Sequence, residues 1–572
     1  MEGALQSVFD RFWQWRLKEA PEFGTMIGEH GYDDDLDDMS LNSYAKRLEN
    51  AKEFVAELEN IDMNLLSKED NMNCKLLHLE LSTYVSGMGF KCHLFPVNCL
   101  EGPHIDFKKT ISWMKTENLK DIEKILSRFN KFPVKIDQTI ELLQKGIETG
   151  YVNAKVSMEN VPNQFAKLVE TPAEESAFYE PFKKLPSSID EKERISLQEK
   201  ALTAITKKLY PAFTKIMNFI KDSYLSACRD DIACTSLPSG KLFYEEVLKF
   251  HLSTDMSSDE VHQIGLDEVA RIHTKMSHVM KETGYTGSFP EFLKYLKNEK
   301  KFYMDNKDEF MMLYQKTCKE IDKLMPKYFN TLPKINYEIK EMPFEVAISG
   351  PGAFFNAGSI EGRPGTFFIN THQLEKKPTY SCPALSLHEA IPGHHHQLSI
   401  AMEATKLPAF RRYVEDKNYY SAPGRFALHV SFVEGWGLYS EYLGEEMKMY
   451  KTPYELFGRL SFEMFRACRC VVDTGMHMKG WSRQQAVDYM IQNTGLPHHE
   501  IENEINRYIT WPGQACGYKI GEIKIRELRK KAENELGENF NLKEFHDCLL
   551  LEGGIPLSVL EQLVDDFIER KK

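Results

Sequence analysis

The residues of this 572-residue chain that could carry chemistry gather in one short segment. Residues 385–397 read LSLHEAIPGHHHQ, which places four histidines and one glutamate within nine residues. Imidazole nitrogens and carboxylate oxygens are preferred ligands of zinc in proteins. A zinc hydrolase helix commonly uses the pattern His-Glu-x-x-His, because side chains four residues apart share a helix face and reach one ion. The segment therefore indicates metal-dependent hydrolysis, although its spacing differs from that pattern.

The spacing after His388 does not fit an unbroken helix. The fourth position on is Pro392, and the next histidine is His394, which an unbroken helix would rotate by about 240° and displace by about 9 Å. Pro392 lacks the N–H that would bond the carbonyl of His388, and Gly393 tolerates backbone angles that other residues avoid. We therefore expect a kink that returns His394 to His388 as the second metal ligand. His395 lies within about 20° of His388 but about 10.5 Å along the axis, and is the second choice.

A third ligand is expected from a helix about 40 residues downstream. The run FVEGWGLYSE at 432–441 has helical character, and Glu434 and Glu441 are seven residues apart, so they share a face. A carboxylate from a second helix completes the zinc site of gluzincins and leaves the fourth position for water. Glu434 is the expected ligand, and Glu441 is expected to hold a ligand histidine through its ring N–H. The alternatives are a surface acid for Glu441 and a solvated helix end for the histidine tract.

The composition describes an ordinary folded protein. Hydrophobic residues make up 42% and charged residues 27% of the chain, without a biased stretch. The formal net charge of −13, with no basic patch, argues against a nucleic-acid or membrane partner. Residues 1–23 lack the continuous apolar run of a signal peptide, and the eleven cysteines follow no repeated spacing, as is typical of reduced thiols. We therefore expect a cytoplasmic protein.

Helical periodicity dominates the elements that must position these residues. Helices are expected at about 43–61, 118–149, 190–226 and 257–282, and helical patterning returns from 384 to the C-terminus. Ser257 and Glu260 have the spacing of a capping box, which marks a helix start. Residues 332–370 instead carry four prolines around short β-prone pieces such as KINYEI and GTFFIN. This stretch predicts one small sheet.

The predicted fold is mainly α, with one small β-sheet beside the active-site helix. We expect a helical N-terminal region at 1–330 that roofs the site and a catalytic region at 331–572. The alternative is that the two regions form one continuous body.

Several motifs of the second half match the pattern of a known family. They are PGAFFNAGSIEGRPGTFFIN, HEAIPGHHHQ, EGWGLYSE, DTGMH at 473–477, NRYITWPGQACGYKIG at 506–521 and FHDCLLLEGGIPLSVLE, which includes His546. In this order they resemble the DUF885 family of predicted zinc metallopeptidases, closely over about Pro343–Glu561 and loosely over the first half. The resemblance implies a helix-rich, zincin-like peptidase in which the pattern H-E-x-x-P-G-H replaces the shorter zinc signature.

The resemblance also implies roles for single residues in a site that holds one zinc ion (Zn2+) per chain. By that pattern His388 and His394 look like zinc ligands, Glu434 like the third ligand and Glu389 like the general base. Zinc would activate a water and polarise the substrate carbonyl, while Glu389 passes the proton of the water to the leaving amine.

The oxyanion of such a reaction needs a hydrogen-bond donor besides zinc. Tyr518 and His477 are the candidates, since both lie in segments that resemble the family pattern. The alternatives are a core tyrosine for Tyr518 and, for His477, a helix-end histidine paired with Asp473.

Substrate contacts are expected on a strand, because zincins hold the substrate backbone on a strand edge beside the metal helix. The strand Gly365–Asn370, which includes Phe367, is the expected edge. Arg363 and Arg507 are candidates for binding a terminal carboxylate, with ordinary surface pairing as the alternative.

The sequence thus predicts a peptidase that acts on short peptides or a small amide substrate. The runners-up are a zinc-dependent hydrolase or lyase of a specialised amide metabolite, and a non-catalytic helical scaffold. The intact Glu389 argues against the scaffold, which has no use for a general base. The sequence does not predict the oligomeric state.

Overall fold

A computed structural model of the chain describes residues 2–343, 347, 350–426 and 429–572. The chain divides into two compact units. Unit 1 comprises 1–246, 415–426 and 509–511, and unit 2 comprises 247–414, 427–508 and 512–572. Residues 247–330, which were expected to belong to the N-terminal region, thus belong to unit 2. The roofing role of the N-terminal region stays a prediction.

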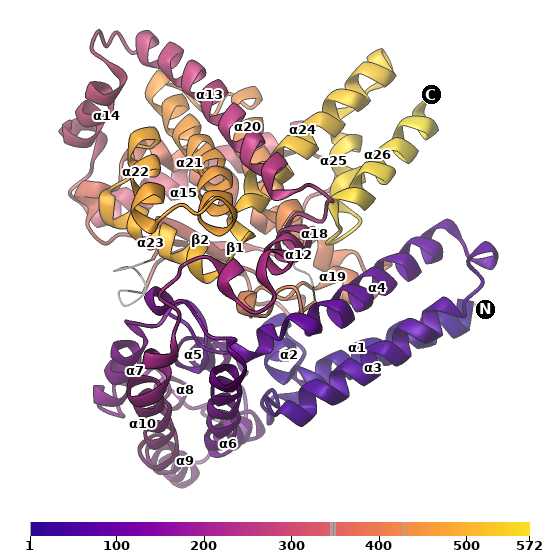
Figure 1. Cartoon of the computed structure of the whole chain (residues 1–572), viewed down its shortest axis with the longest axis vertical. Helices are drawn as coiled ribbons and strands as arrows, with labels where there is room; N and C mark the ends of the chain where they lie inside the picture. The colour runs from indigo at the N-terminus through magenta and orange to yellow at the C-terminus, as the bar shows by residue number, and fades with distance from the viewer. Residues whose placement is uncertain (1, 344–346, 348–349, 427–428) are drawn as a thin grey trace. The chain divides into compact units, whose positions relative to one another are not determined.

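Unit 1 is built of helices. They are α1 (Glu2–Glu19), α2 (Pro21–Ile27), α3 (Leu41–Glu59), α4 (Lys68–Gly87), α5 (Pro103–Trp113), α6 (Leu119–Thr149), α7 (Val161–Glu170), α8 (Glu180–Lys183), α9 (Glu191–Ala204), α10 (Tyr210–Phe219) and α11 (Leu225–Ala227), while α12 (Gly240–Leu252) crosses into unit 2. Helices α1, α3 and α4 lie side by side (Figure 1). Helices α5 to α10 surround a core rich in phenylalanine, with Phe107, Phe132 and Phe213 fully buried.

Helix starts agree with the prediction where a side chain caps the helix. The side chain of Asn118 accepts the N–H of Asp121 just before α6, and Ser257 and Glu260 form a complete capping box before α13. Such caps satisfy backbone N–H groups that have no partner inside the helix. The single helix expected at 190–226 is also present in outline, since α9, α10 and α11 continue through two π-helical turns.

Unit 2 combines helices with the predicted small sheet. Its helices are α13 (Ser258–Glu282), α14 (Phe289–Asn298), α15 (Lys307–Tyr328), α17 (Cys382–Glu389), α18 (His394–Glu403), α19 (Ala409–Arg412), α20 (Val430–Glu446), α21 (Pro453–Met478), α22 (Arg483–Asn493), α23 (His498–Thr510), α24 (Gly517–Leu536), α25 (Leu542–Leu550) and α26 (Leu557–Lys571). Helix α13 packs along α21, and α20 packs along α24. Among the described residues, no helix has the length and apolar character needed to span a bilayer.

The sheet has three strands in the order β1-β3-β2. They are β1 (Tyr337–Glu341), β2 (Ala353–Asn356) and β3 (Gly365–Ile369). Strand β3 pairs with β1 in parallel and with β2 in antiparallel, and its buried side chains pack with α15 and α17 through Tyr314 and Cys382. The mainly helical fold with one small sheet is therefore as predicted.

The prediction that Gly365–Asn370 binds substrate along a strand edge is wrong. Strand β3 is central, so both of its edges are already paired. Phe367 is fully buried in the core beneath the sheet. The side-chain amide of Asn370 donates to the carbonyls of Ala347 (2.9 Å) and Pro351 (3.0 Å). Asn370 therefore stabilises backbone that precedes β2, and its amide is not directed at a substrate.

Candidate metal centre

The histidine segment folds as two helices joined by a tight turn. Helix α17 ends at Glu389 and α18 begins at His394, so the helix is broken at the expected place. The N–H of His395 bonds to the carbonyl of Ala390, five residues back (3.1 Å), where a regular helix bonds four residues back. The extra residue in this turn changes the direction that the side chain of His394 takes.

Close packing holds the turn. A Cβ at residue 393 would lie only 1.8 Å from the carbonyl oxygen of His388, so glycine alone fits there. Gly393 has a φ of −73°, so the glycine serves this close approach and not a left-handed backbone. The indole N–H of Trp436 donates to the carbonyl of Pro392 (2.7 Å), which fixes the turn to α20.

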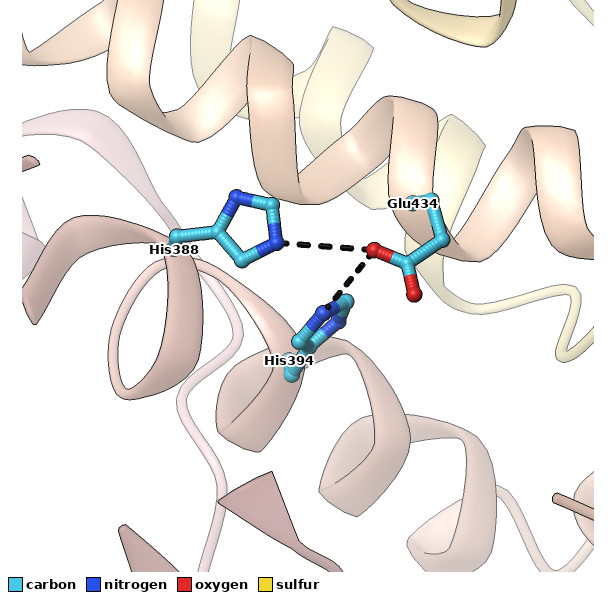
Figure 2. A group of neighbouring side chains, drawn as sticks. All are labelled: His388, His394 and Glu434. Atoms are coloured by element: carbon cyan, nitrogen blue, oxygen red, sulfur yellow. Dashed lines mark ion pairs between the residues drawn. The ribbon is translucent and has the colours of Figure 1, made fainter. Parts of the chain in front are cut away.

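Three predicted ligands meet between α17, α18 and α20 (Figure 2). Oε2 of Glu434 lies 3.5 Å from Nε2 of His388 and 3.3 Å from Nε2 of His394. Ligand atoms of one tetrahedral zinc, bound at about 2.0–2.2 Å, lie about 3.3–3.5 Å apart. Oε2 of Glu434 is buried and has no hydrogen-bond partner among the described residues. The donor set, its spacing and this oxygen all fit a zinc ion.

The ring of His388 is held from two sides. Its Nδ1 lies 2.8 Å from Oε1 of Glu441, so the carboxylate accepts the ring N–H and Nε2 is directed toward Glu434. A Cβ at residue 437 would lie 2.7 Å from the ring, so Gly437 allows the imidazole to lie against α20. Nη2 of Arg466 lies 3.5 Å from the same oxygen of Glu441.

Gly437 and Arg466 were not predicted from the sequence. For Gly437 a signal existed, because a glycine three residues after Glu434 lies on the ligand face of the helix. Arg466 comes from another helix, and no sequence spacing links it to Glu441.

Burial and neighbouring charges set the protonation of the centre. Burial opposes the charge on Glu434, but the two imidazoles outweigh it and hold its pKa well below the usual range. Burial likewise opposes protonation of His388, yet Glu434 and Glu441 raise the pKa of His388 to about 9. Burial raises the pKa of Glu389, and the charges of His388 and His394 offset only part of this rise. A carboxylate with a raised pKa suits a general base.

His395, the second choice as ligand, lies outside this cluster. Its ring packs 4.8 Å from the ring of Tyr337 and 5.6 Å from that of Phe355, so it faces the sheet. Its Nδ1 lies 3.3 Å from Oγ of Ser399. The geometry therefore selects His394, because the turn directs neighbouring histidines to opposite sides.

Tyr518 lies close enough to the cluster to be influenced by its charge. Burial, followed by the negative charge of Glu434, raises the pKa of the Tyr518 hydroxyl, so this group keeps its proton. Nη2 of Arg507 donates to that hydroxyl oxygen (3.1 Å) and to Gln514 (3.1 Å). The guanidinium of Arg469 lies 4.4 Å from the ring centre of Tyr518. Tyr518 is thus held in place by two arginines.

The two other predicted residues are not part of the cluster. His477 is buried near the end of α21. Its Nε2 is hydrogen-bonded to the backbone carbonyl oxygen of Tyr508 (3.0 Å). Arg363 lies in the turn before β3, where its carbonyl accepts the N–H of Ser359 (2.9 Å). The structure does not bring either residue to the three ligands.

Comparison with known proteins gives a family and a fold. The sequence profile of the family described as "Bacterial protein of unknown function (DUF885)" matches residues 21–564. A crystal structure described as a "putative lipoprotein" from Colwellia psychrerythraea matches at 28% identity and a TM-score of 0.92, over 99% of each chain. Another solved structure, described as a "putative lipoprotein of unknown function" from Shewanella oneidensis, matches over 98% of this chain and 99% of its own, at 17% identity and a TM-score of 0.69. No curated protein matches the chain.

Proposed function

The chain belongs to the DUF885 family, whose description assigns no activity, and from the geometry of the site we propose that it is a zinc-dependent hydrolase of amide bonds in short peptides. One observation carries this proposal. Oε2 of Glu434 is buried without a hydrogen bond to the described residues and faces the Nε2 atoms of His388 and His394. A carboxylate and two imidazoles in this arrangement fit the ligand set of gluzincins.

His388, His394 and Glu434 would hold the zinc ion. When bound, zinc lowers the pKa of a water molecule and polarises the substrate carbonyl. The residues of the chain supply the orientation. Glu441 fixes the ring of His388 through the 2.8 Å contact to Nδ1, and Gly437 leaves room for that ring.

Glu389 is the proposed general base. It follows His388 directly at the end of α17, and its side chain is almost completely buried, which raises its pKa above the usual range of a glutamate. Glu389 takes a proton from the attacking water as the oxygen bonds to the carbonyl carbon. It then gives this proton to the nitrogen as the C–N bond breaks, so that an acid and an amine leave.

Tyr518 is the proposed donor to the oxyanion. Its hydroxyl keeps its proton because the pKa of Tyr518 is raised. Nη2 of Arg507 donates a hydrogen bond to the hydroxyl oxygen. The hydroxyl proton therefore remains available to the negative oxygen that forms when water attacks. Arg507 and Arg469 are positioning residues in this scheme, because they act through Tyr518.

The sheet supports peptide binding through a different strand from the one predicted. Strand β2 is an outer strand and packs against α17, which carries His388 and Glu389. A peptide that pairs with an outer strand gains main-chain hydrogen bonds whatever its side chains are. We therefore assign the substrate backbone to the outer edge of β2.

Metal content is the decisive test. We expect about one zinc per chain by mass spectrometry of the purified protein, with near-complete loss in His388→Ala. His395→Ala is the matched control and should keep its zinc. It removes a buried imidazole from the same segment, but this imidazole faces the sheet. If neither the wild type nor zinc-supplemented protein holds metal, the proposal fails.

Catalysis needs a separate test. Glu389→Gln should keep its zinc but lower kcat on short peptides by about 10²–10⁴-fold, the usual contribution of a positioned general base. Full activity in this variant would exclude Glu389 as the base even if the metal site is correct.

A further inference from the structure

Arg466 is a buried cation whose hydrogen bonds are incomplete. It lies on α21, and the residue is 7% exposed. Nη1 lies 3.4 Å from the carbonyl oxygen of Phe462 on the same helix, and Nη2 lies 3.5 Å from Oε1 of Glu441. Nε is buried and has no hydrogen-bond partner among the described residues. Charge-assisted hydrogen bonds are usually about 2.7–2.9 Å long, so both contacts of this guanidinium are long.

Two phenyl rings lie beside the guanidinium. Its central carbon lies 5.1 Å from the ring centre of Phe462 and 5.7 Å from that of Phe465. The face of a ring attracts a cation, but it does not replace the hydrogen bonds of a carboxylate. A buried cation without close acceptors is unfavourable, so a conformation in which Arg466 gains a closer carboxylate partner should be preferred.

Glu441 is a carboxylate with a matching vacancy. The residue is 1% exposed, and its Oε1 lies 2.8 Å from Nδ1 of His388. Its Oε2 is buried and has no hydrogen-bond partner within the described part of the chain. The acceptor without a donor thus belongs to the same carboxylate that Arg466 already approaches.

The atoms without partners are the ones that a side-on ion pair uses. The N–H groups of Nε and Nη2 point to the same side of a guanidinium and are spaced to meet both oxygens of one carboxylate. In this protein Nη2 of Arg466 already lies against Oε1 of Glu441. A shortening of this contact by about 0.7 Å would bring it to the length of a charge-assisted hydrogen bond.

We propose that Arg466 is a positioning residue of the candidate metal centre, which pairs side-on with Glu441 through Nε to Oε2 and Nη2 to Oε1 in the zinc-loaded protein. This inference rests on the proposed function, because it assumes that His388 holds zinc. A carboxylate held at both oxygens cannot rotate, so Oε1 stays directed at Nδ1 of His388 and the ring stays aimed at the metal. Zinc favours the pair because it fixes the imidazole and, through it, the carboxylate.

Zinc affinity, measured by competition with a chromophoric chelator, tests the proposal. Arg466→Lys keeps the charge but cannot form the side-on pair, so the dissociation constant for zinc should rise about tenfold. Arg466→Gln should raise it at least as much. When either change is combined with Glu441→Gln, it should have little further effect, since Arg466 acts through Glu441. Arg459→Lys is the matched control, because it changes a buried arginine of the same helix that pairs with Glu463 and Glu445.

An effect of charge alone would give the opposite result. Arg466→Lys would then bind zinc like the wild type, and Arg466→Gln would bind it more tightly, because a positive charge that repels the metal has been removed. Either result overturns the proposal, as does an additive effect in the double variants. If Arg466→Gln does not fold, Arg466→Lys with and without Glu441→Gln decides the outcome.

The failure of this inference can be told apart from the failure of the proposed function. If the wild type binds no zinc, the proposed function fails and the positioning role fails with it. If the wild type binds zinc and Arg466→Lys binds it equally well, only the positioning role of Arg466 is excluded.

Discussion

Two clusters of unit 2 each bring three potential metal ligands within 4.8 Å of one another, and they differ in what lies between the ligands. In the carboxylate cluster, Nζ of the fully buried Lys519 lies 2.7 Å from an oxygen of each of Glu268, Glu463 and Glu522. In the candidate metal centre, formed by His388, His394 and Glu434, the described ion pairs of Glu434 are with imidazoles only.

The difference shows that proximity of acids does not by itself identify a metal site. The carboxylate cluster already contains its cation, and the arginines around it add further positive charge, as in the pair of Arg526 with Glu522 (2.8 Å). It joins α13, α21 and α24, so its role is structural. The candidate metal centre instead offers two imidazole nitrogens around an oxygen that has no hydrogen bond to the described residues, an arrangement that fits a metal ion.

The largest effect should come from removing the internal cation of the carboxylate cluster. Lys519→Met leaves three carboxylates around an apolar side chain, so the free energy of unfolding should fall by about 3–5 kcal/mol. Urea denaturation measures this, with Lys530→Met, an exposed lysine on the same helix, as the control. A loss no larger than that of the control would mean that Lys519 does not neutralise the cluster.

The next effect should distinguish the clusters by their response to zinc. Zinc at about 100 times its dissociation constant should raise the free energy of unfolding by about 2.7 kcal/mol relative to protein in EDTA. Glu434→Gln should abolish this gain, whereas Lys519→Met should keep it despite its lower stability. If zinc instead stabilises the Glu434→Gln variant and fails to stabilise the Lys519→Met variant, the metal binds at the carboxylate cluster and not at Glu434.

The contrast also explains which features the sequence could predict. The approach of His394 to His388 could be predicted because their spacing relates local helix geometry to ligand chemistry, and the break at Pro392–Gly393 is a local backbone effect. Capping by Ser257 is local in the same way. These features depend on residues that are near one another in the chain.

Features that depend on distant packing were not predicted. The sequence does not reveal that β3 pairs on both sides, because strand order follows from the arrangement of separate strands. For this reason Phe367 and Asn370 were expected at a substrate edge and lie instead in the core. Lys519 meets acids up to 251 residues away in sequence, a relation that no periodicity encodes.

A smaller effect should follow from the carboxylate that orients His388. Glu441→Gln weakens the acceptor of the Nδ1 proton, so zinc affinity should fall by about 10–100-fold. Competition with a chromophoric chelator measures the affinity. Glu445→Gln on the same helix is the control, since Glu445 pairs with Arg459 and not with the histidine. Equal affinities in the two variants would show that the contact with His388 does not influence the metal.

The effect that is smallest per unit of change should be a pH dependence, about tenfold per pH unit, that only the candidate metal centre shows. Although burial opposes it, Glu434 and Glu441 raise the pKa of His388 in the metal-free protein to about 9, from about 6.5 in an unfolded chain. Zinc binds the neutral imidazole and must displace this proton, so the dissociation constant for zinc should fall about tenfold, or about 1.4 kcal/mol, for each pH unit of increase and level off near pH 9.

In EDTA the trend in stability should be the reverse of the trend in zinc affinity. The stabilisation that protonated His388 gains from its carboxylates is fully present below pH 6.5 and is lost as the pH rises toward 9. Glu441→Gln should move both changes to lower pH, because it removes one of the charges that raise the pKa of His388. A zinc affinity that is flat from pH 7 to 9 would mean that His388 is already neutral without metal, so that Glu434 would lack an internal cation of the kind that Lys519 provides in the carboxylate cluster.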